Sequence, residues 1–360
     1  MNIEKEGDML KVGAVDLFCG IGGLTYGLQQ SGINVVAGID LDESCKFPFE
    51  YNNNSQFIHK NISEVTGKEI KRLLKGFDVK ILVGCAPCQP FSSHRKDKKD
   101  RKSHKDWSLL YQFSRVIKES SPDIISMENV PALVEEKVFI DFVNDLKTTG
   151  YHVTFSVINV SDYGVAQSRR RLILLASKKH IIQLVDPTHK NCPNTVRNVI
   201  GNLPAINAGE VSVDDRLHQA SILAYINIRR IQASKPNGTW RDWPDELILK
   251  CHKKESGHSY SSVYGRMGWD NLAPTMTTQF NAYGTGRFGH PIQDRALSLR
   301  EGALLQSFPP NYSFLSESEI VCIKSIARHI GNAVPPRLGE IVGDSIQNCL
   351  SKKGKKKEAE

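Results

Sequence analysis

Between Val12 and Ala176, short apolar runs of strand length alternate with segments in which apolar residues recur every three or four positions. Strands separated by helices of this length form parallel, doubly wound sheets. We therefore predict an α/β fold with a mostly parallel sheet. The expected strands are residues 12–18, 35–39, 80–83, 124–127, 151–159 and 171–176, and the expected helices are 24–30, 109–118 and 138–147.

From about residue 185 to residue 281 the helical period dissolves, and glycine, proline, asparagine and aromatic residues become frequent. Such a segment predicts a second, smaller and loop-rich domain. A helical pattern returns at residues 299–306 and again at 320–328. The chain ends in a lysine-rich run that predicts a basic extension.

Composition narrows the class of protein. The chain has 360 residues, of which 40% are hydrophobic and 24% charged, as in soluble globular proteins. No apolar stretch approaches the ~20 residues of a membrane span, and the N-terminus lacks the apolar core of a signal peptide, so we expect a cytoplasmic protein. The eight cysteines are scattered, which favours reduced thiols over a disulfide framework. A net charge of +8 allows a polyanionic partner without requiring one.

A glycine-rich turn between the first strand and the first helix has the context of a nucleotide-binding loop. Gly20, Gly22 and Gly23 let the backbone approach a ligand, and the helix N-terminus favours an anionic group. Asp40 follows the next strand, where an acid can take the ribose hydroxyls of an adenosine-bearing cofactor. A tight turn with an incidental acid is the alternative. The turn is not a GxGxxG fingerprint, which disfavours NAD.

Cys85 and Cys88 follow the buried-strand pattern at 81–83 with the spacing C-x-x-C. A zinc site would need a second nearby pair, and the remaining cysteines stand singly. A redox centre would leave the glycine turn and most of the chain unexplained. A third interpretation makes Cys88 a nucleophile whose thiolate attacks an electron-poor carbon, and this one explains more.

Six segments, spread in order over nearly the whole chain, resemble the motifs of DNA (cytosine-5) methyltransferases of the prokaryotic restriction–modification type. They are FCGIGG at 18–23, PCQP at 87–90, ENV at 128–130, QSRRR at 167–171, RALSLRE through LQSFP at 295–309, and GNAVPP at 331–336. The resemblance implies a Rossmann-like, S-adenosyl-L-methionine-dependent enzyme. It would methylate carbon 5 of a cytosine that is flipped out of a specific duplex DNA sequence.

The resemblance also implies a role for each catalytic residue. The Cys88 thiolate would add to carbon 6 of the cytosine, which makes carbon 5 nucleophilic toward the methyl group of the cofactor. Glu128 would protonate or hydrogen-bond ring nitrogen N3. Arg169 and Arg171 would hold the flipped base, with Arg171 at carbonyl oxygen O2. A base would then remove the carbon 5 proton, and Cys88 would leave. From local sequence alone, the arginine run is equally compatible with a solvated charged turn.

By the same resemblance, a set of residues around the glycine turn would bind the cofactor. Asn61 departs from the family, which often has an acid there to meet the adenine amino group, although an asparagine oxygen can still accept a hydrogen bond. Leu41 would pack on the adenine. The expected cofactor-binding residues are Asp16, Phe18, Gly20, Gly22, Gly23, Asp40, Leu41, Asn61, Pro87 and Asn332.

DNA contacts are expected from two places. The intensely basic segment 94–105 would be a lid that clamps phosphates over the flipped base, and a surface loop is the alternative. In the second domain, arginines and aromatic residues would contact bases and phosphates or build a small core; they include Trp240, Arg241, Trp243, Tyr260, Tyr264, Trp269 and Tyr283. The residues assigned to DNA are Gln89, Ser92, Arg95, Lys96, Lys98, Lys99, Arg101, Arg266 and Arg287.

The expected organisation is a catalytic, cofactor-binding domain at 1–185 and a target-recognition domain at 186–318. A C-terminal segment at 319–350 would return to the catalytic domain, followed by a basic tail at 351–360. We expect double-stranded DNA as the partner, a nucleoid-associated monomer, and no metal and no membrane contact. A cognate restriction endonuclease would not be physically required.

Two other functions remain open at this point: a transfer-RNA cytosine-5 methyltransferase of the same fold, and a catalytically silent DNA-binding homologue. The sizeable domain between motifs favours DNA, and the joint presence of Cys88, Glu128, Arg169 and Arg171 favours an active enzyme. The redox interpretation predicts that Cys85 matters as much as Cys88. We expect instead that Cys85→Ser retains substantial methylation, whereas Cys88→Ser loses nearly all.

Overall fold

The structure is a computed structural model that describes residues 10–87 and 107–351. The chain separates into two compact units. The first comprises the described residues among 1–158, 170–186 and 338–360, and the second comprises 159–169 and 187–337. In this division the C-terminal segment that rejoins the first unit begins at Leu338, whereas the sequence led us to expect residue 319. None of the helices in the described part of the chain combines the length and the apolar character of a membrane-spanning segment.

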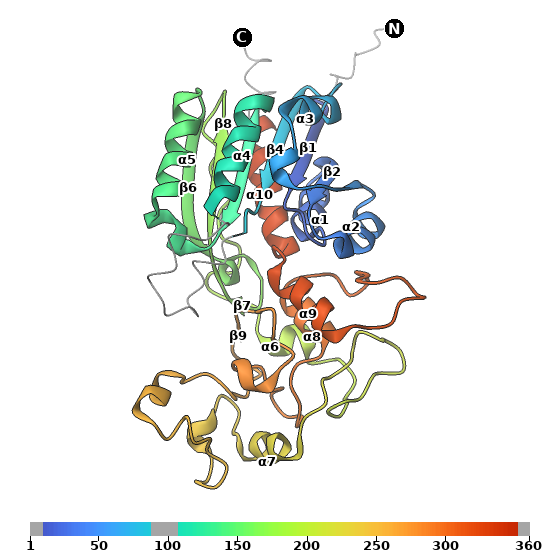
Figure 1. The fold of residues 1–360 in the computed structure, drawn as a ribbon, viewed down its shortest axis with the longest axis vertical. Coiled ribbons are helices and arrows are strands. Elements are labelled where there is room, and N and C mark those ends of the chain that lie inside the picture. The colour runs from blue at the N-terminus through green and yellow to red at the C-terminus, as the bar shows by residue number, and fades with distance from the viewer. Residues whose placement is uncertain (1–9, 88–106, 352–360) are drawn as a thin grey trace. The chain divides into compact units, whose positions relative to one another are not determined.

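The first unit is built on a sheet that has seven strands within the described residues, in the order β3-β2-β1-β4-β5-β8-β6 (Figure 1). Neighbouring strands from β3 to β5 run parallel, and β8 runs antiparallel to β5. The strands are β1 (Val12–Leu17), β2 (Asn34–Asp40), β3 (Gln56–His59), β4 (Val79–Gly84), β5 (Ile124–Asn129), β6 (His152–Asn159) and β8 (Arg170–Ser177). The strand order reverses between β1 and β4, so this is a doubly wound sheet with its switch point there.

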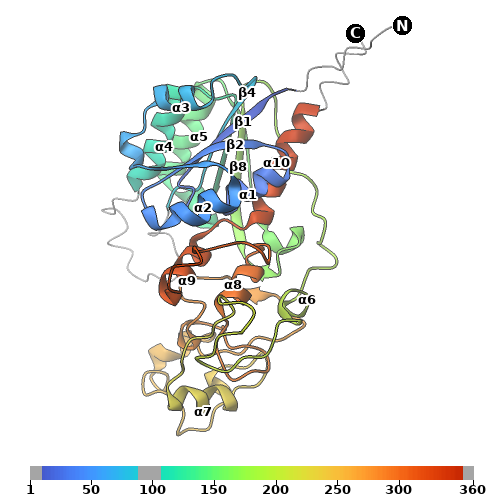
Figure 2. The same ribbon diagram turned by 90° about the vertical axis from the view of Figure 1, so that its right-hand side faces the viewer.

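Helices cover both faces of this sheet (Figure 2). On one face lie α3, α4 and α5, which contact one another in sequence. On the other face α10 packs against α1, so closely that a Cβ at Gly339 would lie 2.5 Å from the carbonyl oxygen of Leu24. The helices are α1 (Gly23–Gln30), α2 (Lys46–Asn53), α3 (Gly67–Leu73), α4 (Trp107–Ser120), α5 (Lys137–Thr148) and α10 (Pro336–Ser351).

Burial of the central strands explains why the apolar runs predicted them so well. All of β5 is buried, and β1 is buried from Gly13 onward. Both faces of such strands meet helices, so most of their residues are apolar on both faces rather than in alternation. Every strand and helix predicted for the first unit is present, within a few residues at each end. The sequence pattern did not predict β3, α2, α3 or α10.

Short 3-10 helices follow several strands of the first unit. Asp42 and Asn61 begin two of them, because each side chain accepts a hydrogen bond from the backbone N–H two residues further on. These elements are η1 (Glu43–Cys45), η2 (Ile62–Glu64) and η5 (Pro131–Glu135).

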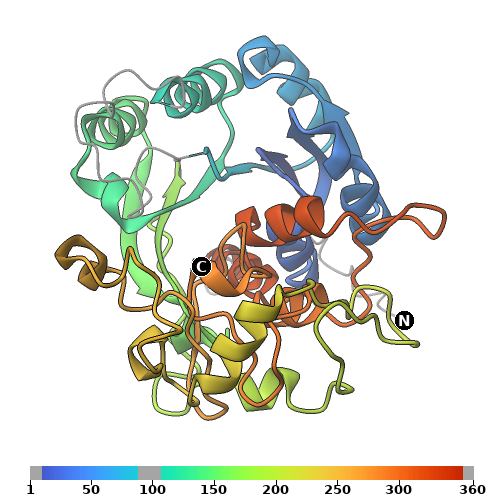
Figure 3. The same cartoon turned by 60° about the horizontal axis from the view of Figure 1, so that its bottom comes forward.

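The second unit is mostly irregular, as its composition predicted (Figure 3). Strands β7 and β9 form a short parallel pair. The predicted helix at 299–306 is present as α8, and the pattern at 320–328 overlaps α9. The unit's elements are η6 (Val160–Tyr163), β7 (Gln167–Ser168), α6 (Val196–Ile200), α7 (Tyr225–Ala233), η7 (Trp240–Asp242), η8 (Glu255–Ser259), β9 (Ala273–Pro274), η9 (Tyr283–Thr285), α8 (Leu299–Leu305) and α9 (Ile323–Asn332).

Candidate active site

A buried carboxylate lies at the carboxyl end of β5. Glu128 is only 5% exposed, and its Oε1 lies 2.7 Å from Nε of Arg171. The antiparallel register, which pairs Asn129 with Leu172, places Arg171 beside the end of β5. A buried carboxylate and a guanidinium that is 13% exposed form an ion pair at this distance, in which each charge offsets the desolvation of the other. The structure therefore brings together two residues that sequence reasoning had assigned to the same base.

The second oxygen of this carboxylate also has a partner. The Cys85 thiol donates to Glu128 Oε2 at 2.7 Å. The backbone around Cys85 is held from two sides: its N–H donates to the Leu17 carbonyl at 3.4 Å, and Asn129 Nδ2 donates to the Ala86 carbonyl at 3.0 Å. The ends of β1, β4 and β5 are thus connected around one carboxylate.

Arg169 lies in the second unit, unlike its neighbour Arg171. It is 4% exposed, and its Nη1 donates to the Met276 carbonyl at 3.1 Å. The residue that pairs with Glu128 in the structure is therefore Arg171. The alternative interpretation of the arginine run at 169–171 was a solvated charged turn, and neither Arg169 nor Arg171 is solvated in that way.

The glycine-rich turn after β1 has the backbone that its sequence predicted. Phe18, Gly20 and Gly22 have positive φ angles of 59°, 51° and 87°. A positive φ is costly for an aromatic residue, and such strain is most often found at functional sites. The Phe18 N–H donates to the Ile39 carbonyl at 2.8 Å, and α1 starts at Gly23. A Cβ at Gly20 would meet nothing within 4 Å, so the turn borders open space.

Asp16 is not available to a ligand, in contrast to the sequence prediction. It is 1% exposed, and its Oδ2 accepts a hydrogen bond from Thr25 Oγ1 at 2.8 Å. Burial is the main cause that raises the pKa of Asp16 to about 7; the Thr25 hydrogen bond opposes it, and the negative charge of Asp40 adds to it. Asp16 therefore ties β1 to α1 beneath the turn rather than contacting the cofactor.

The side chains after β2 suit a nucleoside. Asp40 accepts the Gly20 N–H at 2.8 Å and the Asp42 N–H at 2.9 Å, one on each carboxylate oxygen. It thereby holds the glycine turn, while each oxygen keeps capacity for a further hydrogen bond. Leu41 is 63% exposed, as expected of a residue that packs on an adenine. The open space at Gly20 and these two side chains fit an adenosine-bearing cofactor.

Asn61 uses its oxygen within the protein. Its Oδ1 accepts the N–H of Ser63 at 3.0 Å and the hydroxyl of Ser63 at 2.8 Å. From the sequence we expected the Asn61 oxygen to accept a hydrogen bond from the adenine amino group. In the structure, the Asn61 side chain caps the start of η2.

No contact to a ligand site is described for the remaining assigned residues. Pro87 is exposed at the end of the described segment, and Asn332 is exposed at the end of α9 in the second unit. The predicted nucleophile Cys88 and the basic lid lie outside the described residues. So do the assigned DNA contacts Gln89, Ser92, Arg95, Lys96, Lys98, Lys99 and Arg101.

Arg266, predicted as a DNA contact, is a structural residue. It is 4% exposed, and its guanidinium donates to four backbone carbonyls and to Asp294 Oδ1. This many buried bonds leave no guanidinium edge for a phosphate or a base. Arg287 differs because it is only half-buried, although one of its nitrogens donates to the Asn237 carbonyl.

The aromatic residues of the second unit serve mainly as a small core, which was one of the two uses expected. Trp240, Trp243 and Tyr283 are buried in one cluster, and Tyr264 packs against it. Tyr260 is 49% exposed and Arg241 is exposed, so these two can contact a partner.

Buried polar side chains connect the motif segments within the second unit. Gln167 Nε2 donates to Gln306 Oε1 at 2.7 Å, and Gln306 Nε2 donates to the Ala333 carbonyl at 2.8 Å. The side-chain amides of Gln167 and Gln306 therefore connect three of the motif segments, at 167–171, 295–309 and 331–336. Because both side chains are buried, residues that cannot form these hydrogen bonds would leave polar groups unsatisfied.

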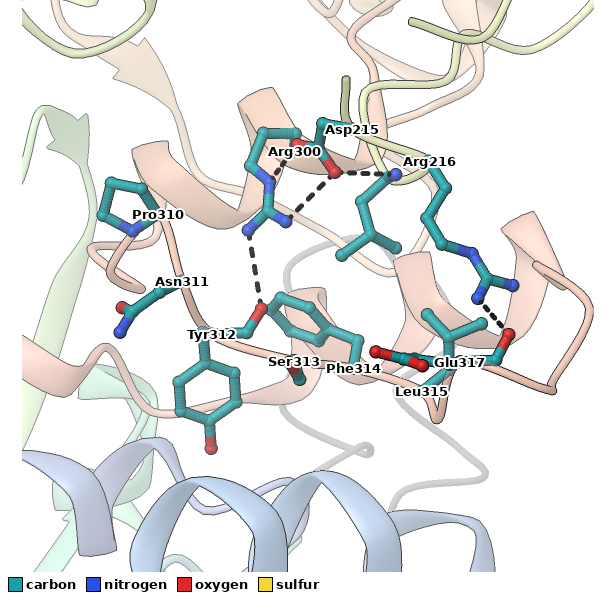
Figure 4. A pocket seen from close by; sticks show the side chains of 11 residues that line it. Asp215, Arg216, Arg300, Pro310, Asn311, Tyr312, Ser313, Phe314, Leu315 and Glu317 are labelled. Atoms are coloured by element: carbon teal, nitrogen blue, oxygen red, sulfur yellow. Dashed lines mark hydrogen bonds and ion pairs between the residues drawn. The ribbon is translucent and has the colours of Figure 1, made fainter. Parts of the chain in front are cut away.

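The segment 295–301 is structural in the same unit. Arg295 is fully buried and binds both carboxylate oxygens of Glu301 at 2.7 Å. Burial alone would raise the pKa of Glu301, but the Arg295 guanidinium outweighs it and holds the pKa below its ordinary value. Arg300 pairs with Asp215 at the wall of a cavity of about 170 Å³ (Figure 4). Arg216, also in that wall, donates to the backbone carbonyls of Ser316 and Glu317, so both of these arginines are engaged within the protein.

Comparison with known proteins decides the family. A profile described as C-5 cytosine-specific DNA methylase matches residues 12–348. This chain belongs to the C-5 cytosine-specific DNA methylase family. It is 55% identical over 344 residues to the type II methylase M.HgiDII of Herpetosiphon aurantiacus, covering 94% of this chain and 96% of that protein. It is 33% identical to the type II methyltransferase M1.BsuMI of Bacillus subtilis, over 92% of this chain and 79% of the other.

Solved structures agree on the fold. The chain matches a protein described as a DNA modification methyltransferase encoded within an E. coli prophage, with a TM-score of 0.71 and 21% identity, over 94% of this chain and 99% of the other. As a member of the C-5 cytosine-specific DNA methylase family, the protein is an enzyme that methylates carbon 5 of cytosine in DNA and uses S-adenosyl-L-methionine as the methyl donor. The family predicted from six short segments is confirmed.

Sequence reasoning missed several residues of the site in this methylase. It treated Cys85 only as half of a C-x-x-C pair and gave no role to Thr25. A side chain that contacts a residue of another strand leaves no local signal. The available hint was position, because Cys85 and Glu128 both stand at the ends of neighbouring parallel strands, which meet at one edge of the sheet.

Proposed function

We propose that this methylase acts on a cytosine flipped out of a specific duplex DNA sequence, through a covalent Cys88 adduct, with Glu128 and Arg171 acting on the base. The observation that supports this proposal most is the buried Glu128–Arg171 pair at the end of β5. It lies at the edge of the sheet to which the chain preceding Cys88 also leads, since β4 ends at Gly84.

In this mechanism the Cys88 sulfur forms a bond to carbon 6 of the cytosine, and electron density moves onto carbon 5 and N3. Glu128 acts in its protonated form: its O–H donates to N3 and offsets the negative charge that develops there, and any proton passed to N3 returns to Glu128 when the adduct breaks down. Arg171 binds Glu128 and offers its remaining N–H groups to the O2 carbonyl. Arg169 contributes to the pocket of the base. After carbon 5 has been methylated, a base takes the carbon 5 proton and the bond between carbon 6 and sulfur breaks, which regenerates the thiolate.

For the cofactor, the structure supports a site formed by the strained turn at Phe18, Gly20 and Gly22 together with Asp40 and Leu41. When bound, S-adenosyl-L-methionine supplies an electrophilic methyl group. Asp40 would accept ribose hydroxyls, and Leu41 would cover the adenine. The helix that starts at Gly23 would face the cofactor's anionic carboxylate with its free N–H groups.

The loop-rich segment, 186–318 by our boundaries, would recognise the DNA sequence. Support comes from exposed side chains that suit nucleic acid, namely Arg241, Tyr260 and the half-buried Arg287. The basic lid at 94–105 would clamp phosphates over the flipped base. We further propose that the enzyme is a type II methylase of a restriction–modification system, as the type II names of M.HgiDII and M1.BsuMI suggest. We also propose that it is a cytoplasmic, nucleoid-associated monomer.

The test is transfer of labelled methyl from S-adenosyl-L-methionine to duplex DNA, to transfer RNA and to a control without nucleic acid. We expect label on duplex DNA only, at carbon 5 of cytosine within one sequence context. Label on transfer RNA alone would reject the DNA substrate. Tight DNA binding without transfer to any acceptor would reject catalysis.

A further inference from the structure

The two oxygens of the Glu128 carboxyl group are held differently. Oε1 lies 2.7 Å from Arg171 Nε as an ion pair, but it accepts no hydrogen bond from the described residues. The terminal torsion of a glutamate is broad, so such a contact alone lets the group rotate about its last bond. The Cys85 thiol donates to Oε2 at 2.7 Å, and this hydrogen bond restricts that rotation.

Cys85 is itself well placed to serve as a fixed donor. Its side chain is half-buried, and its backbone is tied to Leu17 at the end of β1. The next residue, Ala86, is tied by its carbonyl to Asn129 at the end of β5. The thiol therefore reaches Glu128 from a segment anchored to both neighbouring strands, rather than from a free loop.

We propose that Cys85 is a positioning residue for the methylation reaction: its thiol orients the Glu128 carboxylate toward N3 of the target cytosine. Arg171 lies against one oxygen of Glu128, and Cys85 fixes the plane of the carboxyl group, so that the protonated form directs its O–H at N3. A hydrogen bond to N3 that assists addition at carbon 6 must be held to within a fraction of an ångström, and loss of one constraint therefore slows addition. This inference rests on the proposed function of Cys88 and Glu128 and gives the first cysteine of the C-x-x-C pair a role that is neither redox chemistry nor zinc binding.

The test measures the single-turnover rate of the covalent adduct between the full-length enzyme and duplex DNA carrying 5-fluorocytosine, whose fluorine blocks release. Cys85→Ala removes the donor, Cys85→Ser keeps a donor, and Cys349→Ala, a half-buried cysteine on α10, is the matched control. We expect Cys85→Ala to form the adduct about tenfold more slowly, the size of one lost hydrogen bond to a charged group. Cys85→Ser should return to within about threefold of the native rate because its hydroxyl also donates. Cys349→Ala should match the native rate.

Binding separates positioning from a general structural defect. Dissociation constants for DNA and for S-adenosyl-L-methionine should stay within about twofold in Cys85→Ala, because the lost interaction acts on the step after binding. A native adduct rate in Cys85→Ala, or a serine variant as slow as the alanine variant, would overturn the inference and leave the proposed function standing. If the native enzyme formed no adduct and transferred no methyl group, the proposed function itself would fail, and this inference with it.

Discussion

Asp16 makes the stability of this protein depend on pH in an unusual direction. Its folded-state pKa of about 7 lies above its ordinary value of 3.8, mainly because burial disfavours the charged form. Between these two values the folded state binds more protons than the unfolded state, so stability falls as pH rises. Below pH 3.8 the Asp16 carboxyl is protonated in both states, and above pH 7 it is charged in both.

The size of the effect follows from the shift. A change of about three pKa units corresponds to about 4 kcal/mol across the whole window, at 1.36 kcal/mol per unit. Between pH 5.5 and pH 8 the ionisation of Asp16 lowers the free energy of unfolding by about half of that amount, or roughly 2 kcal/mol. An Asp16→Asn variant keeps an oxygen that can accept from Thr25 and has no charge to bury. Relative to that variant, the native protein should therefore lose roughly 2 kcal/mol of stability between pH 5.5 and pH 8.

Urea denaturation of both proteins at the two pH values measures this difference. Asp214→Asn, an exposed aspartate of the second unit, is the control and should follow the native protein. The comparison of variants at each pH cancels the titration of all other groups. If native and Asp16→Asn proteins changed stability in parallel from pH 5.5 to pH 8, the buried protonated carboxyl would be refuted.

Four further substitutions test the site and the second unit. Arg171→Met should lower kcat/KM for methyl transfer by about 100-fold, because it leaves a buried carboxylate without its cation; a native value in steady-state kinetics would contradict the pairing. Arg295→Met should destabilise the protein by about 3–5 kcal/mol, since Glu301 stays buried and charged, and an unchanged thermal midpoint would refute that role. Arg287→Ala should weaken DNA binding and reduce its salt dependence by about one released ion. By contrast, Arg266→Met should lower the thermal midpoint, and a native midpoint would contradict its structural role.

The strands and helices of the first unit were predictable because burial of each element is visible in its own stretch of sequence. The central strands of the sheet are buried on both faces, so their apolar runs stand out in the sequence, as for β1 and β5. The short strand β3 was missed because half of its four residues are exposed and its run is therefore broken. The order of the strands does not follow from any single segment, but once they form a parallel sheet their carboxyl ends meet at one edge.

Motif resemblance indicated candidate site residues, but it did not indicate which side chains contact one another. Glu128 and Arg171 were assigned to one base from motif resemblance, and the structure places them 2.7 Å apart. Asp16 was assigned to the cofactor by family resemblance, and Arg266 was assigned to DNA because guanidinium groups in a loop-rich domain suit phosphates and bases. Their burial depends on the packing of distant segments, which the local sequence does not encode. Cys85 was overlooked for the same reason, since its partner stands more than 40 residues away.

The most direct test of the central claim is to map the protein–DNA adduct that forms on duplex DNA carrying 5-fluorocytosine. Digestion and mass spectrometry would identify the modified residue in the native enzyme and in Cys85→Ser, with Cys88→Ser as the negative control. We predict an adduct on Cys88 in the first two proteins and none in the third, together with substantial methylation by Cys85→Ser and almost none by Cys88→Ser. An adduct on Cys85, or equal loss of methylation in the two serine variants, would contradict the assignment of Cys88 as the nucleophile.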